Sequence, residues 1–259
     1  MTEEELESHY LYNLKILSEY NMENLQQYIK SKNYNENVHH KNMPDNLKMG
    51  LNTLNYIIQL DDLHNDLKKC LIFIKRFPLR KYYEENDIIE IDFIKYHHEV
   101  LIHKIHTILE VIKIAVNDIL KLNIKSKNCN LNSMKTKSAF VNSEFHKLID
   151  AYYKTFENQI NHRHLNTHRA IYLDNVNKDL NTKLGLYKLY KKMNIEVDDE
   201  IQNLIPEFIL ESKVKQYKRE KVNFFKEVIN LTEDFIKKFN ILIIDYFLKN
   251  NLNNEATLN

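Results

Sequence analysis

Apolar side chains recur every three to four residues along most of this chain, a period that predicts amphipathic α-helices. Thr2 and Glu5 have the spacing of a capping box, which marks the start of the first helix. Phe77-Pro78 should end the second helix, and Pro206 should interrupt a short one. Helices are expected over residues 3–30, about 47–75, about 87–122, about 139–160, a stretch reaching about 193, around 197–211 and about 213–250.

Each predicted helix should bury one apolar stripe against the others. The stripe of the second helix is expected to include Leu47, Ile58 and Ile74. The stripes of the third and last helices are expected to include Ile94, Leu101, Ile105, Ile108, Ile112, Ile119, Tyr217, Phe224, Val228, Leu231, Phe235, Phe239, Leu242 and Tyr246.

Few residues in the chain favour tight turns. Only two glycines and three prolines occur in 259 residues, whereas sheet proteins need frequent turns. We therefore expect an all-α fold, a helical bundle in a single domain over residues 1–259. In this bundle, helices at about 3–76 precede a core at about 87–193, and a long helix at about 213–250 follows it.

The charge balance excludes a global attraction for nucleic acid. The net charge is +1, so any RNA binding must depend on a local basic patch. Residues 123–138 form one candidate, a linker with no acidic residue that we expect to be either a solvated, mobile loop or a phosphate-contacting flap. Its lysines are Lys125, Lys127, Lys135 and Lys137.

Nothing in the sequence indicates export or a membrane anchor. The acidic N-terminus lacks the apolar core of a signal peptide, and the most apolar stretch near the C-terminus is too short to span a bilayer and contains Asp245. Cys70 and Cys129 do not have zinc-site spacing and are expected to be free thiols. The expected setting is therefore the cytoplasm.

Most familiar enzymatic motifs are missing. The two glycines, Gly50 and Gly185, exclude a phosphate-cradling glycine loop, and there is no metalloprotease or serine-hydrolase motif. What remains is the segment Asn161-His162-Arg163-His164-Leu165-Asn166-Thr167-His168-Arg169, which holds two of the five arginines and three of the twelve histidines.

This segment combines the groups that RNA backbone cleavage needs. An arginine grips phosphate with a planar, permanently charged fork, and a histidine can transfer a proton near neutral pH. The alternative is structural, since a basic turn of this kind can cap helix ends or meet acidic neighbours. His164 and His168 are also four residues apart and could form a metal pair, although no third ligand is evident. We expect neither a metal nor another cofactor.

The segment resembles the signature of the HEPN superfamily, R-x4-H with a polar residue after the Arg. Here Arg163 is followed by His164 and, five positions on, by His168. The resemblance covers about residues 87–193 and implies a small helical bundle. Many HEPN proteins are metal-independent ribonucleases that act as toxins or abortive-infection effectors, and they dimerise so that two motifs face one cleft.

The resemblance implies a role for each residue of the motif. Arg163 and His168 would be catalytic, with His164 and Asn166 positioning them, and Glu157 could orient one of these side chains. RNA and a second copy of the chain would be the partners, together with an inhibitor or antitoxin. Ala170 stands where members paired with nucleotidyltransferase antitoxins often carry tyrosine, so control by that route is in doubt.

A second histidine cluster lies on the third predicted helix, at His97, His98, His103 and His106. These side chains are expected to be partly buried and bonded to neighbours. The alternatives are a metal site or an acid lent to the catalytic cleft, for which Glu99 is the candidate by analogy.

Two functions therefore follow from the sequence. The first is a HEPN-type, metal-independent endoribonuclease acting in defence or as a toxin. The second is a non-catalytic helical interaction protein that uses its long last helix as a docking surface.

Overall fold

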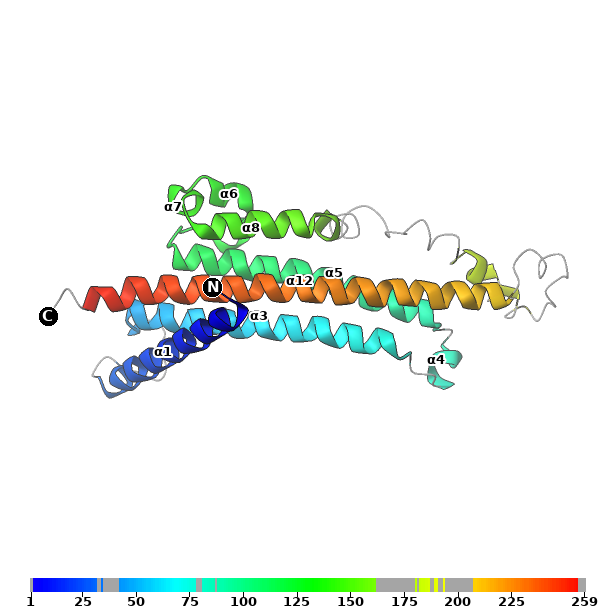
Figure 1. Ribbon diagram of the computed structural model, residues 1–259, viewed down its shortest axis with the longest axis horizontal. Coiled ribbons are helices and arrows are strands. Elements are labelled where there is room, and N and C mark those ends of the chain that lie inside the picture. The colour runs from blue at the N-terminus through cyan, green and yellow to red at the C-terminus, as the bar shows by residue number, and fades with distance from the viewer. Residues whose placement is uncertain are drawn as a thin grey trace. The chain divides into compact units, whose positions relative to one another are not determined.

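Helices form every regular element in the described part of the chain (Figure 1). The computed structural model describes residues 2–31, 34, 42–77, 81–86, 88–161, 180, 182–186, 189–190, 193 and 207–255. The elements are α1 (Glu3–Lys30), α3 (Asp45–Lys75), α4 (Lys81–Glu85), α5 (Glu90–Ile119), η1 (Ser126–Asn128), α6 (Leu131–Lys135), α7 (Ser138–Val141), α8 (Glu144–Thr155) and α12 (Glu207–Glu255). The expected all-α fold class is confirmed. Among these described helices, none is both long enough and apolar enough to cross a membrane.

The chain divides into two compact units. The first contains residues 1–65, 106–156 and 231–259, and the second contains residues 66–105 and 157–230. Since α3, α5 and α12 each contribute to both units, the division does not separate two independent segments of sequence. The expectation of one domain stays a prediction.

The helix start predicted at Thr2 is confirmed in detail. The Thr2 side chain accepts a hydrogen bond from the Glu5 N–H, and the Glu5 carboxylate accepts one from the Thr2 N–H at 2.7 Å. These reciprocal bonds satisfy two donors that the first turn would otherwise leave unpaired. At its other end, α1 stops at Lys30, as predicted.

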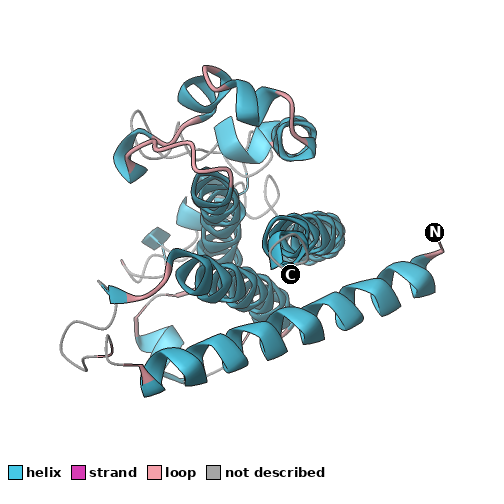
Figure 2. Ribbon diagram, turned by 90° about the vertical axis from the view of Figure 1, so that its left-hand side faces the viewer, coloured by secondary structure: helices cyan, strands magenta, loops and turns pink. Residues whose placement is uncertain are grey.

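In the first unit, α1 lies across the other long helices, which Figure 2 shows nearly end-on. At the crossing, Tyr20 of α1 makes an edge contact with Phe247 of α12, with ring centroids 5.5 Å apart. Gly50 of α3 is the close-approach point, because a Cβ there would lie 2.0 Å from Oδ1 of Asn21. The part of α5 in this unit buries one broad face, formed by Ile108, Leu109, Ile112, Ala115 and Val116.

In the second unit, aromatic contacts and ion pairs join the helices. Phe77 and Phe93 pack with ring centroids 5.5 Å apart, and Phe93 also contacts His97. Lys104 of α5 donates to Asp66 of α3 at 2.6 Å, and this hydrogen bond is the largest of the causes that lower the pKa of Asp66.

Several predicted boundaries are wrong. The last helix begins at Glu207, directly after Pro206, and reaches Glu255, so residues 207–211 belong to it and not to a separate helix. A proline disturbs the helical turn that precedes it, so it does not prevent a helix from starting at the next residue. The helix predicted over about 139–160 is broken at Asn142 and Ser143, between α7 and α8, and turns again at Phe156.

One predicted core position is also wrong. Ile58 is 58% exposed, while its neighbours Tyr56 and Ile57 are buried. Leu47 and Ile74 of the same predicted stripe are 1% exposed, so the error concerns the middle of α3 and not the whole stripe.

Candidate functional site

The motif predicted to be catalytic lies outside the described residues. Arg163, His164, Asn166 and His168 all fall in the stretch 162–179, of which the structure describes nothing. The chain is helical over residues 157–161, and Asn161 is the last described residue before the motif. The roles assigned to these four side chains stay predictions.

Glu157 is described, and its side chain is exposed at the start of that helical stretch. On the same stretch Ile160 is 5% exposed and anchors the segment to the core. Glu157 lies six residues before Arg163, and its exposed carboxylate fits either role considered for it, an orienting group or a surface acid.

The lysine-rich linker is folded, so the expectation of a mobile loop is wrong. Residues 123–138 contain η1 and α6, and the Asn130 side chain caps α6 by accepting from the Ser133 N–H at 2.9 Å. Met134 and, just beyond, Phe140 are fully buried, and the Cys129 thiol donates to the Lys113 carbonyl. Single buried side chains thus hold a segment that is otherwise polar.

The four lysines of this segment differ in their surroundings. Lys125, Lys127 and Lys137 are exposed, and none of them forms an ion pair with a residue that the structure describes. Lys135 instead lies 3.1 Å from a carboxylate oxygen of Asp150, which also contacts His146 at 3.2 Å. Three of the four charges therefore face solvent without a neighbouring acid.

The histidines of α5 in the second unit sit among aromatic rings. His97 is buried, with its ring centroid 4.5 Å from Phe93 and 5.2 Å from Phe73, and this burial lowers its pKa. His98 packs against Phe224 and Phe225 of α12. His103 and Glu99 are exposed.

His106, in the first unit, belongs to a charged cluster on α5. Its Nε2 lies 3.4 Å from Glu110, and the buried Lys113 ammonium donates to the same carboxylate at 2.7 Å. No group of three or more histidine, cysteine or acidic side chains in the described ranges could hold a metal ion. Cys70 and Cys129 are free and buried, and burial raises the pKa of both thiols.

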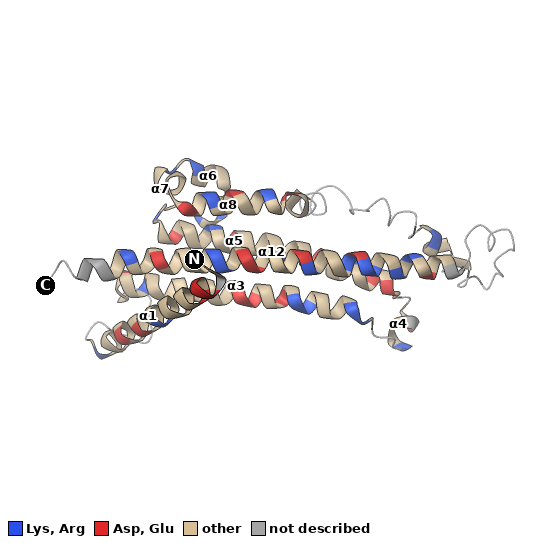
Figure 3. Cartoon of the chain, viewed as in Figure 1, with Lys and Arg blue, Asp and Glu red and all other residues tan. Residues whose placement is uncertain are grey.

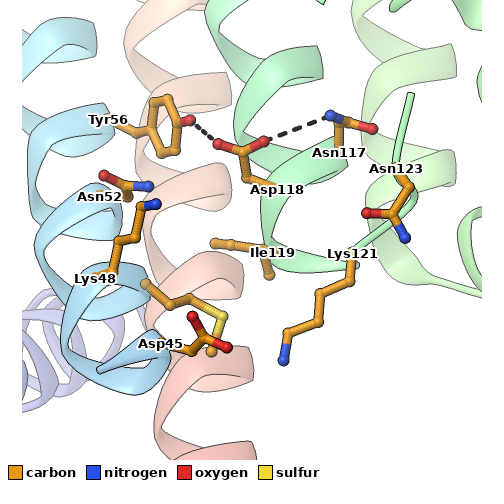
Figure 4. A pocket seen from close by; sticks show the side chains of 10 residues that line it. Asp45, Lys48, Asn52, Tyr56, Asn117, Asp118, Ile119, Lys121 and Asn123 are labelled. Carbon is orange, nitrogen blue, oxygen red and sulfur yellow. Dashed lines mark hydrogen bonds between the residues drawn. The ribbon is translucent and has the colours of Figure 1, made fainter. Parts of the chain in front are cut away.

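The first unit contains a cavity of about 490 Å³ that the sequence analysis did not predict (Figure 4). One wall comes from successive turns of α3 and the other from the end of α5 and the turn after it. The lining residues are Asp45, Lys48, Met49, Asn52, Tyr56, Asn117, Asp118, Ile119, Lys121 and Asn123.

Hydrogen bonds fix one end of this cavity. The Tyr56 hydroxyl donates to one Asp118 oxygen, and the Asn117 amide lies 3.4 Å from the other (Figure 4). Burial, followed by the bond to Asp118, raises the pKa of Tyr56, so the phenol keeps its proton and serves as a donor. The two walls are more than 60 residues apart in sequence, and helical periodicity carries no information about such a pairing.

No family model, curated protein or solved structure matches this chain.

Proposed function

We propose that this protein is a metal-independent endoribonuclease of HEPN type that acts as a defence or toxin effector. The observation that carries the proposal is the motif of Arg163, His164 and His168. Two features of the described residues agree with it, namely the all-helical fold and the helix at 157–161 that leads into the motif.

The chemistry follows from the two catalytic side chains. His168 takes the proton of a ribose 2′-hydroxyl, or gives one to the leaving 5′-oxygen. The 2′-oxygen forms a bond to phosphorus while the bond from phosphorus to the 5′-oxygen breaks. Arg163 binds the phosphoryl oxygens as their negative charge increases, and His164 and Asn166 position the reacting groups. The products are a 2′,3′-cyclic phosphate and a 5′-hydroxyl.

The test is cleavage of RNA by the purified full chain in EDTA, with analysis of the product ends. Wild type should cut and leave 2′,3′-cyclic phosphate, whereas His168→Ala should not cut. Arg163→Lys should lose most activity because a point charge does not reproduce bidentate phosphate contact. His103→Ala and Arg219→Lys, at exposed positions elsewhere, are the matched controls. Equal cleavage by His168→Ala and wild type would refute the assignment.

The second candidate function is a non-catalytic interaction protein. One face of α1 favours it, because Leu11, Met22 and Ile29 are 56%, 57% and 48% exposed and lie eleven and seven residues apart, close to whole helical turns. Growth on inducing wild type beside Arg163→Ala and His168→Ala separates the two functions. Toxicity that disappears in both variants supports the nuclease. Growth that is affected equally by wild type and by both variants supports the interaction protein.

A further inference from the structure

Three polar side chains meet where α1 passes α12 in the first unit. His9 and Asn13 are four residues apart and lie on the same face of α1, and Asp245 comes from α12. The Nε2 atom of His9 lies 3.1 Å and 3.2 Å from the two carboxylate oxygens of Asp245. The amide nitrogen of Asn13 lies 2.8 Å from Oδ1 of Asp245 and 3.0 Å from Nε2 of His9. Three polar atoms, one from each side chain, therefore form a triangle with sides of 2.8, 3.0 and 3.1 Å.

Hydrogen bonds do not satisfy all three contacts while Asp245 is ionised. If Nε2 of His9 carries a proton, it donates to Asp245, and the Asn13 amide nitrogen then faces a second donor. If Nε2 carries no proton, it accepts from Asn13, but its lone pair then faces the carboxylate. Turning the Asn13 amide over places its oxygen against the same carboxylate. In each arrangement, one contact joins two donors or two acceptors.

A cation bound to all three side chains removes this conflict. An imidazole nitrogen, a carboxylate oxygen and an amide oxygen can each give a lone pair to a metal ion. Ligands about 2.1 Å from an ion lie roughly 3.0 Å apart in octahedral geometry and roughly 3.4 Å apart in tetrahedral geometry. The sides of 2.8, 3.0 and 3.1 Å match one face of an octahedron.

The surroundings of the triangle are open and leave the carboxylate available. The side chains of His9 and Asp245 are 39% and 43% exposed, so water can reach the coordination positions that the protein does not fill. Within the described part of the chain, no lysine or arginine forms an ion pair with Asp245. Its negative charge is therefore free to compensate the charge of a bound ion.

The ligand types select among divalent ions. Mg²⁺ and Ca²⁺ prefer oxygen ligands alone, whereas an imidazole nitrogen favours first-row transition metals. We propose that His9, Asn13 and Asp245 bind one divalent transition-metal ion, such as Zn²⁺ or Mn²⁺, with water at the remaining positions. The ion ties α1 to α12 and has no part in RNA cleavage. The sequence analysis expected no metal, because helical spacing does not reveal that α1 and α12 meet at these residues.

The first experiment is isothermal titration of Zn²⁺, Mn²⁺ and Mg²⁺ into the metal-stripped full-length protein. Wild type should bind one more Zn²⁺ ion than His9→Ala or Asp245→Ala. Mg²⁺ should bind this site about a hundredfold or more weakly than Zn²⁺. His103→Ala removes an exposed histidine elsewhere and should bind as many ions as wild type. Equal numbers of bound ions in wild type and His9→Ala would overturn the site, and equal affinity for Mg²⁺ and Zn²⁺ would overturn the transition-metal assignment.

The second experiment separates a metal site from a set of hydrogen bonds, using Asn13→Asp. In EDTA this variant places two carboxylates side by side, so its thermal midpoint should lie below that of wild type. With Zn²⁺, a second charged ligand should tighten binding about tenfold and raise the midpoint by more than in wild type. Wild type itself should gain about 5 °C at a hundredfold excess over its Kd, and His9→Ala should gain nothing from this site. If Zn²⁺ leaves Asn13→Asp as far below wild type as EDTA does, the three side chains form only a hydrogen-bonded contact and the proposal is wrong.

Discussion

Gly50 is the residue on which the crossing of α1 and α3 depends. A Cβ at this position would lie 2.0 Å from Oδ1 of Asn21 and 3.0 Å from the Phe247 ring. Asn21 is only 2% exposed, so its side chain has little room to move away. The close approach therefore requires the residue without a side chain.

We expect Gly50→Ala to lower the free energy of unfolding by about 1–3 kcal/mol, the usual cost of overpacking a core. This loss should exceed the gain of roughly 1 kcal/mol that alanine brings to a helix interior. Gly185→Ala is the matched control, because a Cβ at Gly185 would meet nothing within 4 Å. Urea denaturation of both variants is the measurement, and equal midpoints would contradict the role of Gly50.

His97 gives the fold a pH dependence with a definite sign. Burial lowers its pKa in the folded state below the unfolded value near 6.5, so protons bind the unfolded chain more tightly. The contribution of neutral His97 to the free energy of unfolding is therefore fully present above about pH 6.5. It decreases as the pH falls below that value. His97→Phe, which keeps a ring beside Phe93 and Phe73, should lose less stability than wild type between pH 7.5 and 5, in the approximate range where histidine titrates.

The check is denaturant unfolding at several pH values, read as the change in stability with pH. His103→Phe changes an exposed histidine of the same helix and should keep the wild-type profile. If His97→Phe also keeps that profile, another group causes the pH dependence.

At the scale of the element, the helix predicted best is α5. All six apolar positions expected in its stripe are buried: Ile94, Leu101, Ile105, Ile108, Ile112 and Ile119. Apolar side chains recur along α5 at the helical period over many turns. The face that they define is also the face that packs against the neighbouring helices, so the prediction is correct.

The last helix shows where periodicity is insufficient. Tyr217, Val228 and Phe239 are buried as predicted, but Phe224, Leu231, Phe235, Leu242 and Tyr246 are only partly buried. A continuous buried seam runs through Phe225, Ile229, Thr232, Ile236, Phe239 and Ile243, in steps of four and three, and only Phe239 of these was predicted. This is the seam spacing of packed helices, and in a helix rich in apolar residues two adjacent stripes are equally plausible from sequence.

Short elements and the cavity were beyond prediction for different reasons. Helices as short as α6 and α7 contain too few residues to show a period, and Met134 and Phe140 reveal their anchoring role only in three dimensions. The cavity joins Lys48 to Lys121 across the fold. By contrast, the arrangement of Arg163, His164 and His168 is a local pattern that can be read from the sequence alone, and its catalytic role stays a prediction.

The folded segment from η1 to α7 leads to a prediction on RNA binding, motivated by its three exposed lysines. Replacing Lys125, Lys127 and Lys137 with alanine should weaken RNA binding and flatten its salt dependence. Each lost contact with single-stranded RNA should reduce the slope of log K against log salt by roughly 0.7, because fewer counterions are released. The measurement is fluorescence anisotropy with labelled RNA over a range of salt concentrations, on the His168→Ala background.

Lys135 supplies the internal control for this experiment. Lys135 already pairs with Asp150 at 3.1 Å. Lys135→Ala should therefore change the salt slope less than alanine at Lys125, Lys127 or Lys137 alone. An unchanged slope in the triple variant would remove the segment from the RNA-binding surface.

At the scale of the whole molecule, charge offers little attraction for RNA. The net charge is +1, and Figure 3 shows acidic and basic residues interspersed along α12. If the chain binds RNA, local contacts must therefore supply most of the affinity. One arginine and one histidine per chain are few groups for phosphodiester cleavage, and a second copy of the chain would double them.

We predict a symmetric homodimer in which two copies of Arg163 and His168 face one cleft. Two-fold homodimers are the commonest oligomers, and the interface should bury more than roughly 1,000 Å².

The decisive measurement mixes two inactive variants, Arg163→Ala and His168→Ala, under conditions that exchange subunits. Each mixed dimer contains one intact Arg163 and one intact His168, on different chains. If both motifs serve the same phosphate, mixing should restore part of the RNA cleavage, in proportion to the fraction of mixed dimers. Each variant alone, incubated identically, is the control. A solution mass of one chain with full cleavage, or mixed dimers with no activity, would show that each motif acts without its partner.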